Sequence, residues 1–145
     1  MSSQGKSSSG NLPTPTGGGG ALVKNAELTQ LDFELEFFAG ILDRHPEYVD
    51  VLRVHGNNLT LKGLFADGLK IDKRLVKLRP ADALAHYNLA CSLSLLRKRD
   101  SALKTLRQAI ELGYRDFQYM LEDRDLDFIR NDPRFNSLMN EFEEV

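Results

Sequence analysis

The residues of this 145-residue chain that could do chemistry are three histidines, one cysteine and a short run of aspartates. A nucleophilic cysteine needs a base within hydrogen-bond reach. His86 lies five residues before Cys91, a spacing that puts the two side chains off the facing positions of a helix. The histidines at positions 45, 55 and 86 lack the paired spacing of metal ligands, and Cys91 has no neighbouring cysteine. The sequence therefore predicts no catalytic residue, no metal site and no cofactor, and it predicts that the chain is not an enzyme.

Two further patterns resemble ligand-binding loops but lack their essential residues. Asp123, Asp125 and Asp127 alternate like the start of a calcium loop, without the glycine and the final glutamate that such a loop needs. The four glycines at 17–20 lack the Lys-Ser/Thr pair and the preceding strand of a phosphate-binding loop. We therefore expect polar turn residues in the first case and a linker in the second.

A repeat is the strongest pattern in the chain. Pro46, Pro80 and Tyr114 stand 34 residues apart, and a similar pattern of apolar and small residues surrounds each of them. A period of 34 residues built from two amphipathic helices is typical of an array of helical hairpins. Such hairpins stack into a solenoid whose surface holds another chain.

The clearest unit runs from Ala83 to Asp116. Asp82 is placed to cap its first helix and Asp100 its second, and Gly113 is placed to end the second helix. Apolar and small residues recur at helical spacing on both helices. They are His86, Leu89, Ala90 and Leu93 on the first helix, and Ala102, Leu106, Ala109, Ile110 and Leu112 on the second.

This unit resembles the tetratricopeptide repeat (TPR) family at the positions that define it. The family's slots are held by His86, Leu89, Ala90, Leu93, Ala102, Leu106, Ala109 and Tyr114. The preceding unit follows the same frame with Leu52, Gly56, Leu59, Gly63 and Pro80. The resemblance implies an all-α fold, a short α-solenoid of antiparallel helical hairpins with a helical C-terminal cap.

The expected organisation has an arm and one domain. Residues 1–24 are rich in Ser, Gly and Pro, cannot bury enough apolar surface to offset their ordering, and are expected to form a flexible arm. The TPR-like domain of residues 25–145 has one continuous core in this interpretation. It divides into a half-unit at 27–48, a unit at 49–82, a unit at 83–116 and a cap at 117–145.

The two ends of the array are expected to differ from the complete units. The half-unit has an apolar stripe that stops at His45-Pro46, and Gly17 to Gly20 stand where the first helix of its repeat would lie. The cap resembles the closing segment that follows the last repeat of many bacterial TPR proteins. Asp116 is placed to cap its first helix, and Pro133 to begin its last.

The resemblance also implies where a partner binds. In this family the first helix of each unit lines a concave groove. The candidate partner-binding residues of that groove are Arg53, Asn57, Tyr87, Asn88 and Cys91. The sequence thus predicts a non-enzymatic interaction or scaffold module that binds a protein or peptide segment.

A more specific expectation concerns a peptide's terminal carboxylate. Chaperone-adaptor members hold it with a basic residue and an asparagine on one unit and an asparagine on the next, and Arg53, Asn57 and Asn88 match these slots. The following unit should supply two more basic residues. Gln118 and Glu122 stand there instead, and the charge of Glu122 would repel a carboxylate.

Two alternatives remain open at the sequence level. Residues 49–113 carry 12 Lys and Arg against 6 Asp and Glu, and the basic side chains concentrate in the stretch 70–79. That stretch is a candidate RNA-binding helix face. The acidic segment 114–145, with 4 basic and 9 acidic residues, would oppose nucleic acid, so an outer solvated face is favoured. The second alternative is a self-association module.

Composition sets an expectation for the compartment. No stretch approaches the roughly 20 apolar residues that a membrane span needs. One cysteine cannot form an internal disulfide, which is compatible with a reducing compartment. A cytoplasmic protein that does not contact membranes is the expectation.

Two polar residues fall where the repeat frame expects apolar ones. His55 and Asp72 are both expected to point into the hairpin interface of the unit 49–82. A lone buried polar group there would cost about 1–3 kcal/mol. The sequence therefore predicts that the two side chains form a hydrogen bond with each other.

Overall fold

The computed structural model describes the backbone of residues 19–143 and the side chains of residues 30–143. Over this range the chain is all-α, without a strand. The helices are α1 (Gly19–Arg44), α2 (Val49–Lys62), α3 (Phe65–Leu78), α4 (Ala83–Leu95), α5 (Arg99–Glu111), α6 (Phe117–Glu122), the 3-10 helix η2 (Arg124–Leu126), α7 (Asp127–Arg130) and α8 (Pro133–Glu143).

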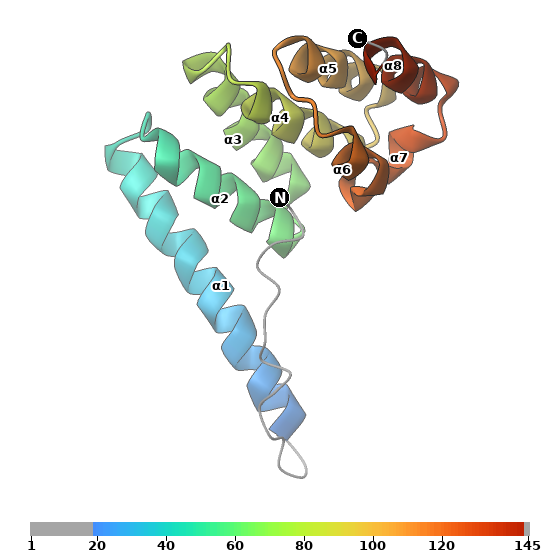
Figure 1. Cartoon of the computed structure of the whole chain (residues 1–145). Coiled ribbons are helices and arrows are strands. Elements are labelled where there is room, and N and C mark those ends of the chain that lie inside the picture. The colour runs from blue at the N-terminus through green and yellow to red at the C-terminus, as the bar shows by residue number, and fades with distance from the viewer. Residues whose placement is uncertain (1–18, 144–145) are drawn as a thin grey trace.

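Consecutive helices pack as antiparallel pairs, which confirms the predicted fold class. Figure 1 shows α1 to α5 laid side by side and the short helices of the cap closing the C-terminal end of the array. Residues 1–18 of the expected arm lie outside the described residues. Helix α1 begins at Gly19, so residues 19–24 belong to that helix.

Most of the expected helix ends are observed. The carboxylate of Asp82 accepts hydrogen bonds from the backbone of Leu84 and Ala85, at 3.0 and 3.2 Å, and that of Asp116 accepts one from Tyr119. Gly63 and Gly113 end their helices with φ of 87° and 118°, in the left-handed region that glycine tolerates.

The predicted capping role of Asp100 is wrong. Helix α5 begins at Arg99 after Lys98, and no side chain caps it. Asp100 therefore already lies inside the first turn, two residues after the N-cap position, and it cannot accept the free backbone N–H groups as an N-cap does. Its carboxylate instead pairs with Arg134 of the cap at 2.9 Å.

The apolar core forms two clusters rather than the continuous core expected. The N-terminal cluster consists of Leu42, Val51, Leu52, Leu59, Ile71, Leu75 and Ala85. The C-terminal cluster gathers buried residues of α4, α5 and the cap, together with Leu69 of α3. The two clusters meet where α3 packs against α4, so this junction holds the repeats together.

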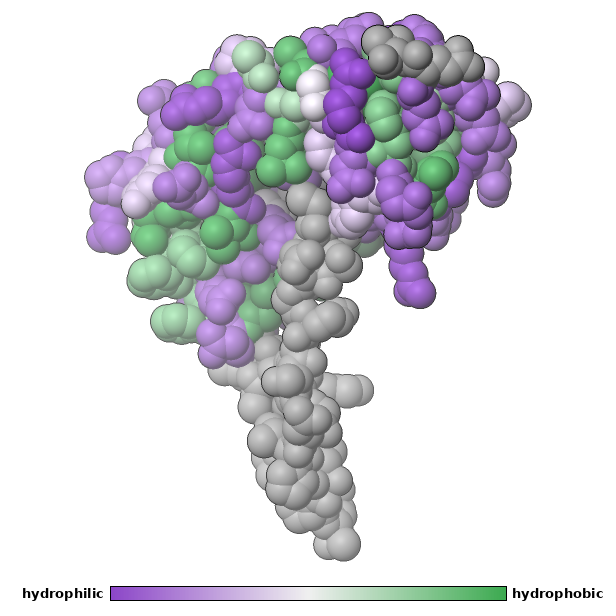
Figure 2. All heavy atoms as spheres, in the orientation of Figure 1, coloured by the Kyte–Doolittle hydropathy of each residue, from purple (hydrophilic) through white to green (hydrophobic). Residues whose placement is uncertain are grey.

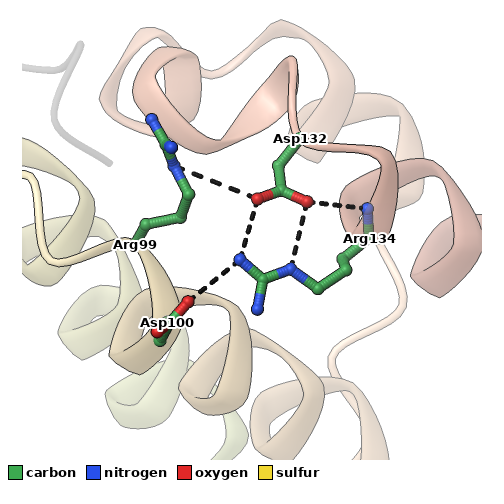
Figure 3. A network of polar contacts seen from close by, with 4 residues as sticks. All are labelled: Arg99, Asp100, Asp132 and Arg134. Atoms are coloured by element: carbon green, nitrogen blue, oxygen red, sulfur yellow. Dashed lines mark hydrogen bonds and ion pairs between the residues drawn. The ribbon is translucent and has the colours of Figure 1, made fainter.

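Helix α8 keeps the period of the repeats although its sequence departs from them. Arg107 of α5 forms two hydrogen bonds with Glu141, at 2.8 and 3.0 Å, and these residues are 34 positions apart. Asp100 and Arg134 are also 34 positions apart. Figure 3 shows Arg134 between Asp100 and Asp132, with Arg99 approaching Asp132 from α5. The cap is thus attached to α5 by charge as well as by apolar packing.

Large apolar side chains that remain exposed concentrate near the N-terminal hairpin. They include Phe33, Phe37, Tyr48, Val54, Leu61 and Leu64. In Figure 2 hydrophilic residues cover much of the visible face, and hydrophobic ones gather at the left, over α1 and α2. Within the described part of the chain, no helix is long and apolar enough to span a bilayer.

The left-handed end of α2 leads to a stability prediction. Replacing Gly63 by alanine puts a Cβ on a backbone with φ of 87°, and should lower the free energy of unfolding by about 1 kcal/mol or more. The matched change is Gly40→Ala inside α1, where an added Cβ meets no atom within 4 Å. It should raise stability by up to about 1 kcal/mol. Urea unfolding measures both, and equal effects of the two changes would contradict the assigned conformations.

Candidate functional site: a groove between α2 and α4

A groove with a volume of about 230 Å³ opens between the first helices of the two complete units. Four of the five candidate partner-binding residues line it: Arg53, Asn57, Asn88 and Cys91. The rest of the lining consists of Gly56, Thr60, Asp72, Leu75, Leu84, Ser92, Leu95 and Asp125. The structure thus brings together residues from α2, α3, α4 and η2, and their role in binding stays a prediction.

The fifth candidate, Tyr87, is buried and does not line the groove. Its ring stacks on Tyr114 with centroids 4.2 Å apart, and its hydroxyl donates to Asp123 at 2.7 Å. Burial raises the pKa of Tyr87 far above its ordinary value, so the hydroxyl remains a donor. Tyr87 turns inward because it lies one helical position before Asn88, about 100° away around α4.

Arg53 is committed to an ion pair inside the protein. Its guanidinium forms a hydrogen-bonded ion pair with Asp82, the residue that caps α4. Burial acts to raise the pKa of Asp82, but the hydrogen bond from Arg53 and those from the helix backbone outweigh it and lower the pKa. The pair links α2 to the start of α4 and uses the one cationic side chain of the groove lining.

Asp72 is the buried acid of the groove. Its side chain is 8% exposed, and its Oδ2 accepts a hydrogen bond from the Ser92 hydroxyl at 2.5 Å. Its Oδ1 lies 3.2 Å from the place where a Cβ of residue 56 would stand, so Gly56 leaves room for the carboxylate. Burial raises the pKa of Asp72 to about 6, although the bond from Ser92 acts in the opposite direction.

The predicted hydrogen bond between His55 and Asp72 is wrong. His55 is buried as expected, but its Nδ1 has no partner among the described residues. His55 lines a separate pocket beside Leu42 and Arg74, whereas Gly56, the next residue of α2, faces Asp72. Burial lowers the pKa of His55, and the charge of Arg74 lowers it further. Asp72 pairs across the repeat junction with Ser92, a residue with no distinctive sequence signal.

A cluster of possible metal ligands lies beside the groove. Cys91, Asp123 and Asp125 each bring one ligand atom to within 4.8 Å of the others. Hydrogen bonds already account for Asp123, which accepts from Tyr87, from the Cys91 thiol at 3.7 Å and from the Asp125 backbone at 3.0 Å. Burial, and then the charge of Asp123, raise the pKa of Cys91, so it stays a thiol, not the thiolate that metals and nucleophilic catalysis need.

The raised pKa of Asp72 makes stability depend on pH. The folded-state pKa, about 6, lies above the ordinary value of 3.8. The contribution of the protonated Asp72 carboxyl to the free energy of unfolding is therefore complete below about pH 4 and is lost as the pH rises to about 6. Asp72→Asn should remove this dependence. Relative to wild type, the variant should gain about 2–3 kcal/mol in free energy of unfolding between about pH 4 and pH 7.

The measurement is urea unfolding of wild type and Asp72→Asn at several pH values, with Asp67→Asn as control. Asp67 lies on the same helix but is exposed. The lowered pKa of His55 gives a dependence of opposite sign, which wild type and Asp72→Asn share, so it cancels in their difference. The charge of Asp67 acts to raise the pKa of His55, so Asp67→Asn should deepen the His55 dependence but should not show the gain expected of Asp72→Asn. Parallel stability curves for wild type and Asp72→Asn would show that Asp72 is not titrating in a buried site.

Comparisons with known proteins give a partial relationship. No family model matches the chain, and no solved structure matches it significantly. A chloroplastic protein of Arabidopsis thaliana is 36% identical to the chain over 62 residues. The match covers 43% of this chain and 18% of the relative, so the chain spans less than a fifth of that protein's length. The relative contains tetratricopeptide repeats, and the helical hairpins described above are consistent with repeats of that kind.

Proposed function

We propose that the chain is a non-enzymatic interaction module that binds a segment of a partner protein in the groove between α2 and α4. The observation that carries the proposal is the pair Asn57 and Asn88. Both are half-buried, both come from the first helix of a complete unit, and both line the same groove. A carboxamide donates and accepts hydrogen bonds, so two of them facing one groove suit the backbone of an extended peptide.

The partial relationship to a TPR protein supports this proposal, because TPR modules generally mediate protein interactions. The groove favours an internal segment over a terminal carboxylate. Arg53 already pairs with Asp82, and Gln118 donates a hydrogen bond to Glu122 at 2.6 Å in the cap. The two positions that would need basic residues to neutralise a terminal carboxylate therefore hold a neutral side chain, Gln118, and an acidic one, Glu122.

The basic stretch 70–79 supports RNA binding less well. Lys70, Lys73, Arg74 and Lys77 are exposed, and no ion pair engages them within the described residues, but they lie outside the groove lining. A nucleic-acid site would give binding that weakens steeply with salt. Tight, salt-sensitive RNA binding that is lost in Lys73→Glu/Lys77→Glu would reject the groove as the main site.

The groove proposal predicts the effect of removing its two amides. Peptides selected from a phage library of random sequences on the wild-type protein should bind Asn57→Ala/Asn88→Ala about tenfold or more weakly, since each lost hydrogen bond costs about 1 kcal/mol. Calorimetry with one selected peptide measures the loss. Asn136→Ala, an exposed change on α8, is the control and should bind as wild type does. Selected peptides that bind all three proteins equally would contradict the proposal.

A second candidate function is self-association through α1. Phe33 and Phe37 are 59% and 52% exposed, and their rings stack with centroids 5.9 Å apart. The ring of Phe37 also makes a T-shaped contact with that of Phe38, which packs against the N-terminal cluster, with centroids 5.4 Å apart. No described helix other than α2 packs closely on α1. Exposed aromatic pairs of this kind are common at protein interfaces.

Sedimentation equilibrium tests this second candidate. Wild type should show a concentration-dependent rise in mass that Phe33→Ser/Phe37→Ser abolishes. Leu121→Ser, which changes an exposed leucine of α6 far along the chain, should leave the rise unchanged. A wild-type protein that stays monomeric up to millimolar concentration would exclude self-association through this face.

A further inference from the structure

The groove contains a buried carboxylate whose charge the protein leaves uncompensated. Asp72 lines the groove from α3, is 8% exposed, and has the neutral Ser92 hydroxyl as its partner. No ion pair joins it to a cation anywhere in the described chain. Removing a carboxylate from water without a counter-charge is costly, so a site of this kind gains when a cation arrives.

The groove itself cannot supply that cation. Arg53 is the one basic residue of the lining, and Asp82, which caps α4, holds its guanidinium. The remaining charged residues of the lining, Asp72 and Asp125, are both acidic. Asp72 therefore has no free cation within the groove lining, although the segment 49–113 that contains most of the groove is basic overall.

The shape at Asp72 is suited to one side chain rather than to a flat surface. Gly56 has no side chain to cover the carboxylate, and a Cβ there would approach both Asp72 Oδ1 and Ile71 Cγ2 to 3.2 Å. Asn57 follows Gly56 on α2, and Asn88 lies on α4, so amides that suit a peptide backbone line the same groove as the acid. Asp72 is not part of the cluster of possible metal ligands formed by Cys91, Asp123 and Asp125.

We propose that the partner segment bound in this groove is basic, and that one Lys or Arg side chain of the segment pairs with the carboxylate of Asp72. This proposal rests on the proposed function, since it names the chemistry of the segment that the groove binds. The long aliphatic stem of either residue would lie along Leu75 and Leu84 of the groove lining. The cation would then replace the missing counter-charge of Asp72.

The experiment is a paired selection followed by a double-mutant cycle. A phage library of random peptides is selected on wild type and on Asp72→Asn, with Asp67→Asn as a control that removes the same charge from the exposed side of α3. Wild type and Asp67→Asn should enrich Lys or Arg at one fixed position, and Asp72→Asn should not. Circular dichroism of the three proteins checks that each is folded.

One selected peptide and its variant with norleucine at the basic position then enter calorimetry. Each single change, Asp72→Asn or the peptide change, should weaken binding about tenfold, and the two together should weaken it little more than either alone. Because the peptide change leaves the protein intact, this result does not depend on how well Asp72→Asn folds.

The outcomes separate the two proposals. Peptides that need Asn57 and Asn88 but show no enriched basic position, or additive losses in the cycle, would overturn the pairing with Asp72 and leave the groove as the binding site. A selection that yields no peptide dependent on Asn57 and Asn88 would overturn the proposed function, and the pairing with it.

Discussion

The structure depends on the burial of α4 by neighbours on several sides. Ala85, Ala90 and Leu93 lie on this helix at exposures of 0%, 0% and 6%, and its residues contribute to both apolar clusters. A helix that is apolar around most of its circumference is stable only when it is covered. Here α3, α5, η2 and α7 cover it. The small residues of α4 allow this close approach, and the two repeats and the cap are ordered around it.

The polar residues of α4 fix how its neighbours are aligned. Ser92 holds Asp72 of α3, while Tyr87 and Cys91 hold Asp123 at the start of η2. These bonds involve buried groups, so losing one partner leaves the other unsatisfied. The groove is a consequence of the same arrangement, because the outward residue Asn88 is positioned by a helix whose other faces are fixed. A binding surface on such a frame is largely preformed.

The fold could be predicted from the sequence because it depends on features that are local and periodic. The periodic feature is the 34-residue spacing of the repeat. The local features are the capping carboxylates of Asp82 and Asp116 and the helix end at Gly113, each of which acts within a few residues of its position. The partner of Asp72 could not be found in this way. His55 and Asp72 both break the repeat frame, which suggests that they pair, but the direction of the His55 side chain depends on its angular position around α2. Ser92 departs from no position of the repeat frame, so the sequence does not single it out. The stacking of Tyr87 on Tyr114 is likewise a tertiary contact, which the spacing of residues along α4 does not reveal.

The central claim is that partners bind between α2 and α4, and chemical-shift mapping tests it most directly. Amide spectra of the isotopically labelled protein would be recorded during titration with a peptide selected on the wild-type chain. The account predicts that the largest shifts fall on Asn57, Asp72 and Asn88 and on their neighbours in the groove. Shifts concentrated on the basic face of α3 at residues 70–79, or on α1 around Phe33 and Phe37, would contradict it.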